Sequence, residues 1–422
     1  MREMKDSGVE WIGYIPASWQ TLTVGSLFKV RNEKVNDTDY PPLSVTKSGV
    51  VPQMENVAKS DANDNRKMVL ANDFVINSRS DRKQSCGVSP LDGSVSLINT
   101  VLYPAKGVPI VPEYLNYLLK NHGFAEEFYR WGHGIVADLW TTRWQEMKSI
   151  LLPIPSMEEQ QQILDAISAQ TDKVDALIAN VQAQIEKLKA YKQSLITEVV
   201  TKGLDPTVPM KDSGVEWVSQ IPATWGMSRV GLHYIIILGK MLCPNQIDIT
   251  YSLEKYFCAA NIHFGEIVTD ELKEMWFSRA EKEQYHIAVG DMLIVEGGAG
   301  AGGCAIVKQP TDALVQNSVM IVRNLRGTDN RYLRYWIESM VKRGYLEVVC
   351  NKATIPHYTK EKLAKTVMPV LPQDEQTQIA DFLDEKCSQI DCLIAIKQSK
   401  IEKLEQYKRS LIYEYVTGKK EV

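Results

Sequence analysis

Apolar residues recur at intervals of mostly three and four positions along two polar segments, which predicts two long amphipathic helices. In the first segment the stripe is Ile163, Ile167, Val174, Leu177, Val181, Ile185, Leu188, Leu195 and Val199. In the second segment it is Ile379, Leu383, Ile390, Leu393, Ile401, Leu404 and Leu411. Two helices with such stripes can bury both stripes by packing on each other.

The ends of the first helix are marked by capping signals. Ser156 and Glu159 form a capping box, and Gly203 marks the far end, so the helix is predicted over about 157–201. The second helix is predicted over about 373–417. With a rise of 1.5 Å per residue, about 45 residues give a helix roughly 65 Å long.

The segments before each helix carry shorter apolar runs between turn residues, which are typical of strands, followed by a helical pattern. The predicted strands are Phe74–Ile76, Val95–Tyr103, Met292–Val295 and Ala313–Arg323, and the predicted helices are Pro112–Lys120 and Asn330–Lys342. Each insert is therefore expected to be a mixed α and β unit of roughly 130 residues.

The chain is a tandem duplication. Residues 4–19 return as 210–225 with 12 of 16 positions identical, and residues 185–201 return as 401–417 with 12 of 17 identical. A weaker register at an offset of 218 relates the two inserts through Asp73 and Asp291, Cys86 and Cys304, Asn99 and Asn317, and Tyr114 and Tyr332. We expect the two inserts to share a fold and to differ in surface, with the paired asparagines serving the fold.

Composition narrows the class of protein. The chain of 422 residues is 44% hydrophobic and 24% charged, which fits two or more globular domains. Its apolar runs fall far short of the roughly 20 residues of a membrane span, and a cytoplasmic location is expected. The seven cysteines include no Cys-x-x-Cys pair, so neither a disulfide framework nor a zinc ribbon is indicated. A formal charge of −4 argues against a free-standing, non-specific nucleic-acid binder.

The glycine-rich string at 297–303 is the one segment that resembles a cofactor motif. It carries the dinucleotide pattern at Gly298, Gly300 and Gly303, but a predicted strand follows where that pattern requires a helix. The equivalent stretch of the first insert is Arg79–Ser85, so we interpret the string as a strand-to-strand loop that is cationic in one copy and glycine-rich in the other. Such a variable loop is suited to reading two different ligands.

The sequence contains no Walker loop, and its six histidines show neither metal-ligand spacing nor a nucleophile motif. A duplicated chain without a catalytic constellation is predicted to bind and not to catalyse. Two other classes remain open: a duplicated coiled-coil scaffold that binds only proteins, and a cofactor-binding enzyme built on the glycine loop.

Several motifs carry a family resemblance. Gly8-Val9-Glu10-Trp11 with Ile15-Pro16 returns at Gly214 to Trp217 with Ile221-Pro222. Leu152 to Pro155 leads into Glu159-Gln160-Gln161-Gln162-Ile163, and Met368-Pro369-Val370 leads into Glu375-Gln376-Thr377-Gln378-Ile379. Over its whole length the chain resembles the specificity subunits of type I restriction-modification systems.

This resemblance implies an α+β fold: two mixed α/β target recognition domains joined by two long helices that form an antiparallel coiled coil, with an internal pseudo-two-fold repeat. The implied segments are 1–156 (N-terminal conserved segment and first recognition domain), 157–203 (central helix), 204–372 (repeated segment and second recognition domain) and 373–422 (distal helix). The resemblance further implies that each domain reads one half of a split, asymmetric DNA site and that the helices set the separation of the halves.

The resemblance also implies partners and an absence of catalysis in this chain. Two modification subunits are expected to bind S-adenosylmethionine and to methylate adenine N6 after flipping the base. Restriction subunits are expected to use ATP and Mg, and no cofactor or metal is expected in this chain. Double-stranded DNA is the expected ligand, and no membrane is involved.

Residues for DNA contact are chosen as donors in turn-like contexts. In the first domain they are Lys47, Arg79, Arg82, Lys83, His133 and Arg143; in the second they are Gly298, Gly300, Asn351, Lys352, Thr354, His357, Tyr358 and Lys360. The helix face that carries Glu186, Lys187, Lys192, Glu402, Lys403 and Lys408 is the candidate partner-binding surface. The two glycines are chosen because the backbone can approach phosphate closely there. For the charged residues the ordinary alternative is a solvated surface charge.

Overall fold

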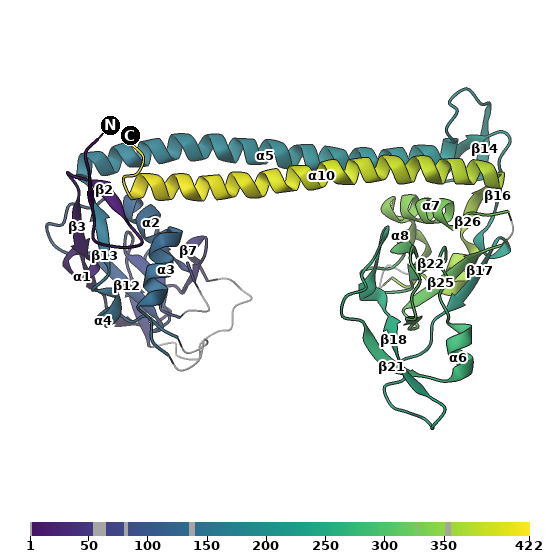
Figure 1. Cartoon of the computed structure of the whole chain (residues 1–422), viewed down its shortest axis with the longest axis horizontal. Coiled ribbons are helices and arrows are strands. Elements are labelled where there is room, and N and C mark those ends of the chain that lie inside the picture. Colours follow the sequence, from purple (N-terminus) through teal and green to yellow (C-terminus); the bar gives the residue numbers. More distant parts are fainter. Residues whose placement is uncertain (1, 54–64, 80–82, 135–139, 326, 351–355) are drawn as a thin grey trace. The chain divides into compact units, whose positions relative to one another are not determined.

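The computed structural model describes residues 2–53, 65–79, 83–134, 140–325, 327–350 and 356–422 (Figure 1). Spatial contacts divide the chain into two units. Unit 1 comprises Met1–Gln182 with Gln398–Val422, and unit 2 comprises Ala183–Lys397. Each unit therefore combines one insert with parts of both long helices. Within the described ranges, no helix has the length and apolar character needed to cross a membrane.

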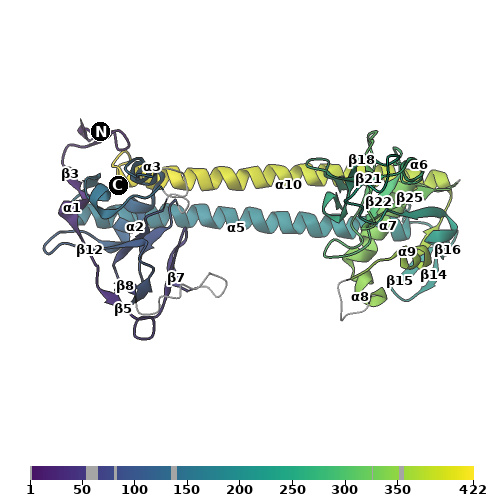
Figure 2. The same ribbon diagram turned by 90° about the horizontal axis from the view of Figure 1, so that it is seen from below.

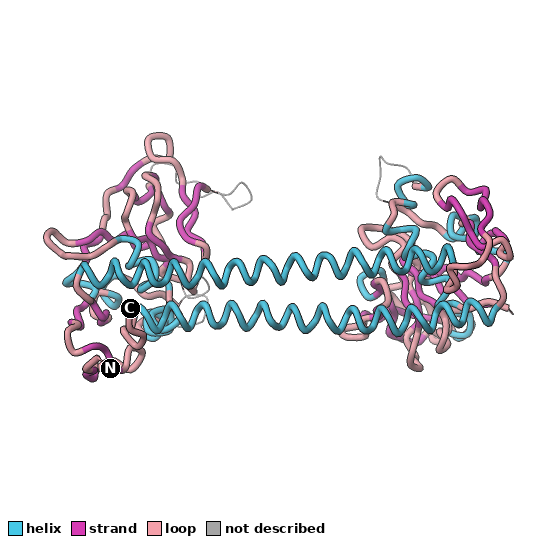
Figure 3. The backbone as a smooth tube through the Cα atoms, turned by 90° about the horizontal axis from the view of Figure 1, so that it is seen from above, coloured by secondary structure: helices cyan, strands magenta, loops and turns pink. Residues whose placement is uncertain are grey.

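The two long helices are present with the predicted bounds to within a residue or so: α5 is Met157–Lys202 and α10 is Gln373–Val416. In each unit a stretch of α5 lies beside a stretch of α10 and runs in the opposite direction (Figures 2 and 3). In unit 1 Lys408 Nζ lies 2.6 Å from Asp175 Oδ2, and in unit 2 Lys192 Nζ lies 2.6 Å from Asp391 Oδ2. These ion pairs are equivalent, because both residues of the second pair follow from the first by the repeat offset of 216.

Most of the predicted stripe is buried or half-buried, but two members are exposed. Leu177 of α5 is 49% exposed and Leu393 of α10 is 47% exposed. These residues are also 216 positions apart, so the departure from the stripe is itself repeated. Their three- or four-residue spacing predicted that they would lie in the seam, which is the line of contact between α5 and α10. This line turns gradually around a long helix, so both leucines lie on the outer side.

The sheets of the two inserts have the same strand order. Unit 1 has a sheet in the order β10–β9–β12–β4, and unit 2 has one in the order β23–β22–β25–β17. Here β4 is Phe28–Val30, β9 is Phe74–Asn77, β10 is Cys86–Val88, β12 is Asn99–Pro104, β17 is Tyr234–Leu238, β22 is Met292–Val295, β23 is Cys304–Ile306 and β25 is Val319–Asn324. The expectation that both inserts share a fold is thus confirmed in this sheet.

The remaining elements of unit 1 surround this sheet. They are β1 (Met4–Asp6), β2 (Tyr14–Pro16), β3 (Gln20–Thr23), α1 (Val24–Leu27), β5 (Lys34–Val35), β6 (Leu43–Thr46), β7 (Gly49–Pro52), β8 (Arg66–Val69), β11 (Gly93–Val95), α2 (Pro112–Lys120), α3 (His122–Arg130), α4 (Trp144–Met147) and β13 (Leu151–Ile154). Strand β3 pairs with β13, so the insert begins and ends on one antiparallel pair.

Unit 2 repeats that arrangement with β16 and β26 as the closing pair. Its remaining elements are β14 (Met210–Val215), β15 (Val218–Pro222), β16 (Gly226–Arg229), β18 (Ser252–Phe257), β19 (Ile262–His263), β20 (Glu266–Ile267), β21 (Lys273–Phe277), α6 (Arg279–Gln284), β24 (Leu314–Val315), α7 (Asn330–Lys342), α8 (Tyr345–Val349), α9 (Lys360–Lys365) and β26 (Val367–Val370). Short 3-10 turns cover 230–232 and 259–261.

Two predicted strands are each split by a turn. The segment predicted as one strand over 95–103 consists of β11 and β12, and the Asn99 amide donates to Ser96 O at the turn between them. The segment predicted over 313–323 consists of β24 and β25, with a turn between Gln316 and Val319. The first turn contains the apolar Leu97 and Ile98, so apolar content alone does not show it. The second turn, Gln316 to Ser318, is polar and carried a turn signal that the strand prediction overlooked.

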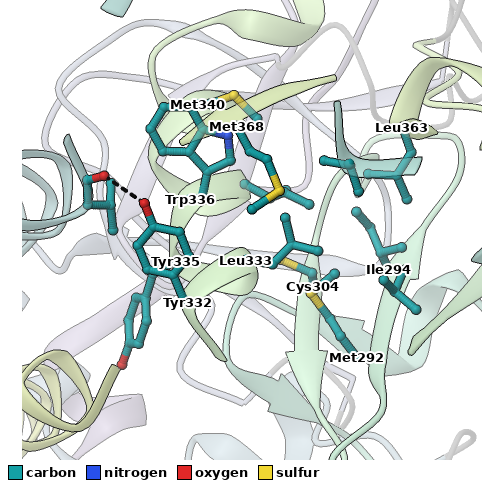
Figure 4. Packing of buried hydrophobic residues seen from close by; sticks show 14 of the residues in the cluster. Met292, Ile294, Cys304, Tyr332, Leu333, Tyr335, Trp336, Met340, Leu363 and Met368 are labelled. Carbon is teal, nitrogen blue, oxygen red and sulfur yellow. Dashed lines mark hydrogen bonds between the residues drawn. The ribbon is translucent and has the colours of Figure 1, made fainter. Parts of the chain in front are cut away.

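The core of unit 2 forms where α7 packs on the sheet. Leu333 and Trp336 of α7 are buried, as are Ile294 and Cys304 of the sheet. Figure 4 shows Leu333 next to Cys304, with Trp336 further along the helix. The predicted bounds of α2 and α7 are both confirmed, because their apolar faces show the helical period clearly.

Candidate nucleic-acid interface

A groove of about 500 Å³ opens at one end of the unit 1 sheet. Arg79, Arg143 and Lys67 supply its basic groups, and Thr141 and Ser78 lie on its wall. The remaining lining residues are Val30, Asn32, Leu97, Ile98, Thr100, Trp144 and Gln145. The structure thus brings together two of the arginines that the sequence suggested, from segments more than 60 residues apart.

The backbone around Arg79 is held by strand pairing. Arg79 forms an isolated antiparallel bridge with Thr141, and the Thr142 amide donates to Ser78 O over 3.0 Å. The Arg79 amide donates to Asn77 Oδ1 over 3.0 Å. The Arg79 side chain is exposed, so its guanidinium is presented from a fixed backbone at the groove.

Arg143 precedes helix α4 and is also exposed. Its amide donates to Glu146 Oε2 over 3.0 Å, which closes the first turn of this short helix. Two exposed guanidiniums on one groove suit bidentate donation to phosphate or to guanine edges.

Lys67 was missed by the sequence analysis. Its Nζ donates to Asn99 O over 2.7 Å, and burial lowers the pKa of this amine. It lies in β8 between the buried Arg66 and Met68, in a segment where the sequence analysis predicted no strand. A lysine at a strand position next to a groove has no local signature that separates it from a solvated lysine.

The other predicted contact residues of unit 1 lie outside this groove lining. Lys83 is paired with Glu126 at 3.1 Å and lies 4.1 Å from the Tyr129 ring centroid, so an internal carboxylate already offsets its charge. Lys47 is exposed in the turn between β6 and β7. His133 is exposed, and its backbone pairs with Thr141, which lies between it and Arg79.

Four candidate residues lie outside the described residues: Arg82, Asn351, Lys352 and Thr354.

The glycine string of unit 2 is a strand-to-strand loop. It joins β22 to β23, which pair antiparallel with Met292 opposite Ile306. Since a strand follows the loop, the helix that a dinucleotide site needs at this point is not there. Gly298 has φ +88 and Gly300 is exposed, and a Cβ at either position would meet no close neighbour except Val295 at 3.9 Å from position 300.

The structure places Tyr358 in the core of unit 2. It is fully buried, and its hydroxyl lies 2.7 Å from Thr366 Oγ1. The sequence context of turn residues suggested a surface aromatic, but the ring lies in the buried core of unit 2, edge-on to Tyr345 of α8. Tyr358 is therefore removed from the candidate contact residues, and its role is to anchor the segment that carries His357.

His357 and Lys360 remain exposed candidates of unit 2. His357 forms an antiparallel bridge with Gly297, and Lys360 is the first residue of α9. Glu296 lies next to Gly297; burial raises the pKa of its carboxyl, whereas the nearby His357 lowers it. Basic and acidic side chains thus meet at this end of the unit 2 sheet.

The candidate partner-binding residues divide into two groups. Lys192 and Lys408 are half-buried and hold α5 and α10 together through Asp391 and Asp175. The other four are exposed on the outer faces of the helices: Glu186, Lys187, Glu402 and Lys403. Sequence spacing does not distinguish a lysine beside the seam from a lysine on the outer face.

Burial keeps the equivalent cysteines of the two inserts, Cys86 and Cys304, in the thiol form. Burial raises the pKa of Cys86 to about 12, and it also raises that of Cys304. Among the residues that the structure describes, no group of His, Cys, Asp and Glu is arranged to hold a metal ion.

Comparison with known proteins finds similarity to one family. The sequence model described as the type I restriction modification DNA specificity domain matches residues 277–406. The chain is 23% identical over 448 residues to the putative type I restriction enzyme MjaX specificity subunit of Methanocaldococcus jannaschii, covering 97% of this chain and 95% of that protein. It is 24% identical over 284 residues to the MjaVIII specificity subunit of the same organism, covering 64% of this chain and 62% of that protein.

Solved structures show the same fold. The HsdS subunit from Thermoanaerobacter tengcongensis is similar at a TM-score of 0.51 and 18% identity, over 96% of this chain and 98% of that chain. A chain from a structure on complex assembly and conformational transition of the type I R-M system reaches a TM-score of 0.69 at 17% identity, over 95% and 98% of the two chains. The chain is therefore similar to type I restriction-modification specificity subunits over nearly its whole length. The matched residues 277–406 include the glycine loop, His357 and Lys360.

Proposed function

We propose that the chain is the DNA-recognition subunit of a type I restriction-modification complex and that each unit reads one half of a split, asymmetric site. The observation that carries this proposal is that the two units repeat one sheet order and present different side chains at its end. Unit 1 presents a groove with Arg79 and Arg143, and unit 2 presents the glycine loop with His357. A repeated frame with different reading residues suits two unlike half-sites.

The formal charge of the chain favours DNA binding as part of a complex with other subunits over DNA binding by the chain alone. The formal charge of −4 leaves the chain without the excess of Lys and Arg that non-specific phosphate binding requires. Three basic side chains, Lys67, Arg79 and Arg143, gather at the unit 1 groove. We infer that this chain supplies base contacts, while partner subunits provide much of the phosphate contact.

The chemistry belongs to the partners in this proposal. Two modification subunits bind S-adenosylmethionine and methylate adenine N6, and restriction subunits use ATP and Mg for cleavage. The specificity subunit contributes no catalytic residue. It positions the methyltransferases by binding DNA with one unit for each half-site.

The outer faces of the long helices offer an equivalent surface in each unit for a modification subunit. Tyr191 is 58% exposed and Tyr407 is 52% exposed, and these residues are 216 positions apart, as are the exposed Leu177 and Leu393. On its stretches of α5 and α10, each unit thus carries one exposed leucine and one exposed tyrosine, along with exposed Glu and Lys residues. Two such repeated apolar sites are the kind of surface that two copies of one partner can cover.

The test is a methylome obtained by single-molecule sequencing from cells that co-express this chain with its modification subunit. A split, adenine-methylated motif that disappears without this chain would support the proposal and give both half-sites. If a complex assembles and no motif appears, the chain would instead be a coiled-coil scaffold that binds only proteins, a function that the paired long helices alone could serve.

A further inference from the structure

The ends of β9 in unit 1 and β22 in unit 2 make the same backbone bridge. Arg79 pairs with Thr141 in unit 1, and Gly297 pairs with His357 in unit 2. The first members of the two pairs are 218 positions apart and the second members 216 apart, which are the offsets that relate the inserts and the long helices. The two bridges are therefore one position of the repeated fold.

The neighbouring hydrogen bonds confirm this equivalence. The Thr142 amide donates to Ser78 O over 3.0 Å, and the Tyr358 amide donates to Glu296 O over 2.6 Å. Both donors are anchored: Thr142 Oγ1 donates to Phe128 O over 2.7 Å, and the buried Tyr358 hydroxyl lies 2.7 Å from Thr366. The residue before each donor, Thr141 or His357, is thus held on a fixed backbone.

At this position the two units carry the long side chain on different strands of the bridge. In unit 1 the first strand carries Arg79 and the second carries the short Thr141; in unit 2 the first carries Gly297 and the second carries His357. A Cβ at position 297 would lie 2.7 Å from His357 Nδ1 and 3.0 Å from Cε1, which is closer than real contacts allow. The imidazole therefore occupies the space that a side chain on residue 297 would need.

We propose that this bridge is a specificity-determining position in each unit, and that Arg79 reads DNA from it in unit 1 and His357 in unit 2. The proposal rests on the function proposed above. Both side chains are exposed at the same end of the repeated sheet, and Arg79 lines the basic groove.

The two side chains offer different hydrogen-bonding patterns. The Arg79 guanidinium can donate two bonds to O6 and N7 of one guanine. The neutral His357 imidazole offers one donor and one acceptor, and it lies near the Glu296 carboxyl, where unit 1 has the hydroxyl of Ser78. The same backbone position thus addresses different bases in the two half-sites.

The experiment exchanges the two pairs within the assembled complex of this chain and its modification subunits. The variants are R79G/T141H, which gives unit 1 the pair of unit 2, and G297R/H357T, which gives unit 2 the pair of unit 1. Lys106→Ala is the control, because Lys106 is exposed in the turn after β12, at the opposite end of that strand from the groove. Binding is measured by competition with duplexes that change one base pair of the wild-type motif at a time.

We expect R79G/T141H to lower discrimination at a base pair of one half-site at least about tenfold, with the other half-site unchanged. G297R/H357T should do the same for the other half-site, and Lys106→Ala should change neither. The steric part of the proposal predicts that G297R alone melts at a lower temperature than G297R/H357T, because only the double variant removes the imidazole. Equal melting temperatures would contradict that part.

Failure of this inference is distinct from failure of the proposed function. If the wild-type complex yields a split motif and both exchange variants keep full discrimination at every base pair, the bridge does not read DNA, whereas the proposed function stands. If an exchange variant does not assemble, the single variants R79A and H357A keep the opposing strand intact. Unchanged discrimination in both single variants would equally overturn the inference.

Discussion

At the scale of single residues, the repeat is expressed as equivalent hydrogen bonds at the ends of the long helices. The Tyr114 hydroxyl donates to Val416 O over 3.2 Å, and the Tyr332 hydroxyl donates to Val200 O over 3.1 Å. Both carbonyls belong to the last turn of a helix, where no intrahelical donor follows. Burial raises the pKa of both tyrosines, so the phenols stay protonated and act as donors.

Tyr332→Phe and Tyr114→Phe should each lower the free energy of unfolding by about 1 kcal/mol, because each leaves a buried helix carbonyl without its donor. Urea unfolding of each variant would measure the change. Tyr407→Phe, at a 52% exposed residue, is the matched control and should leave stability unchanged. A loss in the control as large as in the buried variants would show that the hydroxyl bonds are not the cause.

At the scale of elements, a glutamine in the first turn ties each long helix to its insert. Gln160 is fully buried; its Oε1 accepts from the Val111 amide over 2.8 Å, and its Nε2 donates to Pro109 O over 3.0 Å. Gln376 repeats this tie in unit 2 by accepting from the Asp329 amide over 3.0 Å. The inserts are thus hydrogen-bonded to the starts of α5 and α10.

Gln160→Ala should cost about 2 kcal/mol or more of unfolding free energy, because it leaves several buried backbone groups unpaired. The exposed neighbour Gln161 offers the control, and Gln161→Ala should stay within about 0.5 kcal/mol of the wild type. Guanidinium unfolding of the two variants side by side gives the comparison. Equal free energies of unfolding of Gln160→Ala and Gln161→Ala would show that the hydrogen bonds of Gln160 do not stabilise the protein.

The exposed tyrosines of the helices make a prediction about assembly. Tyr191→Ala with Tyr407→Ala should weaken binding of the modification subunit and leave the melting temperature of this chain unchanged, because both rings are more than half exposed. Size-exclusion chromatography with light scattering would measure the number of partner subunits bound. Full binding by the double variant would place the partner on another surface.

The length of the helices is predicted to set the unread spacing between half-sites. Four residues inserted after Ala190 and four after the equivalent Gln406 lengthen each helix by roughly 6 Å and turn it by about one turn. The methylated motif should then keep both half-sites and gain about two unread base pairs. A two-residue insertion, which rotates the faces by about 200°, should instead impair assembly. An unchanged number of unread base pairs in the four-residue variant would show that the length of the helices does not set the spacing between the half-sites.

At the scale of the whole molecule, each unit has a core of its own. The unit 1 core joins Phe74 and Leu102 of the insert to Ile163 of α5 and Leu411 of α10, and the unit 2 core joins its own insert to Ile196 and Ile379 in the same way. Strand β3 pairs with β13 at the boundary of the first insert. The residues between these two strands can therefore be replaced without disrupting the rest of the unit.

Replacing residues 22–148 by the corresponding insert of another specificity subunit should therefore change one half-site of the methylated motif and preserve the other. Single-molecule sequencing of the methylome would report both halves in one experiment. A change in both half-sites would contradict the assignment of one reader to each unit.

The long helices, the duplication and the shared insert fold could all be predicted from the sequence, because each depends on local periodicity or on comparison of the chain with itself. The bounds of α2 and α7 were predicted for the same reason. The family resemblance, too, depended on short motifs and their order along the chain.

Which residues come together at the site could be known only from the tertiary structure. Arg79, Thr141 and Lys67 meet only because strand pairing joins distant segments, and the ring of Tyr358 is buried because residues of other elements, such as Tyr345, pack around it. Lys192 and Lys408 lie beside the seam for a similar reason, since the face of a helix is set by its neighbour. The sequence by itself determined which elements form and that they repeat, because those properties are local; which side chains face DNA, the partner or the core depends on long-range packing, which only the tertiary structure decides.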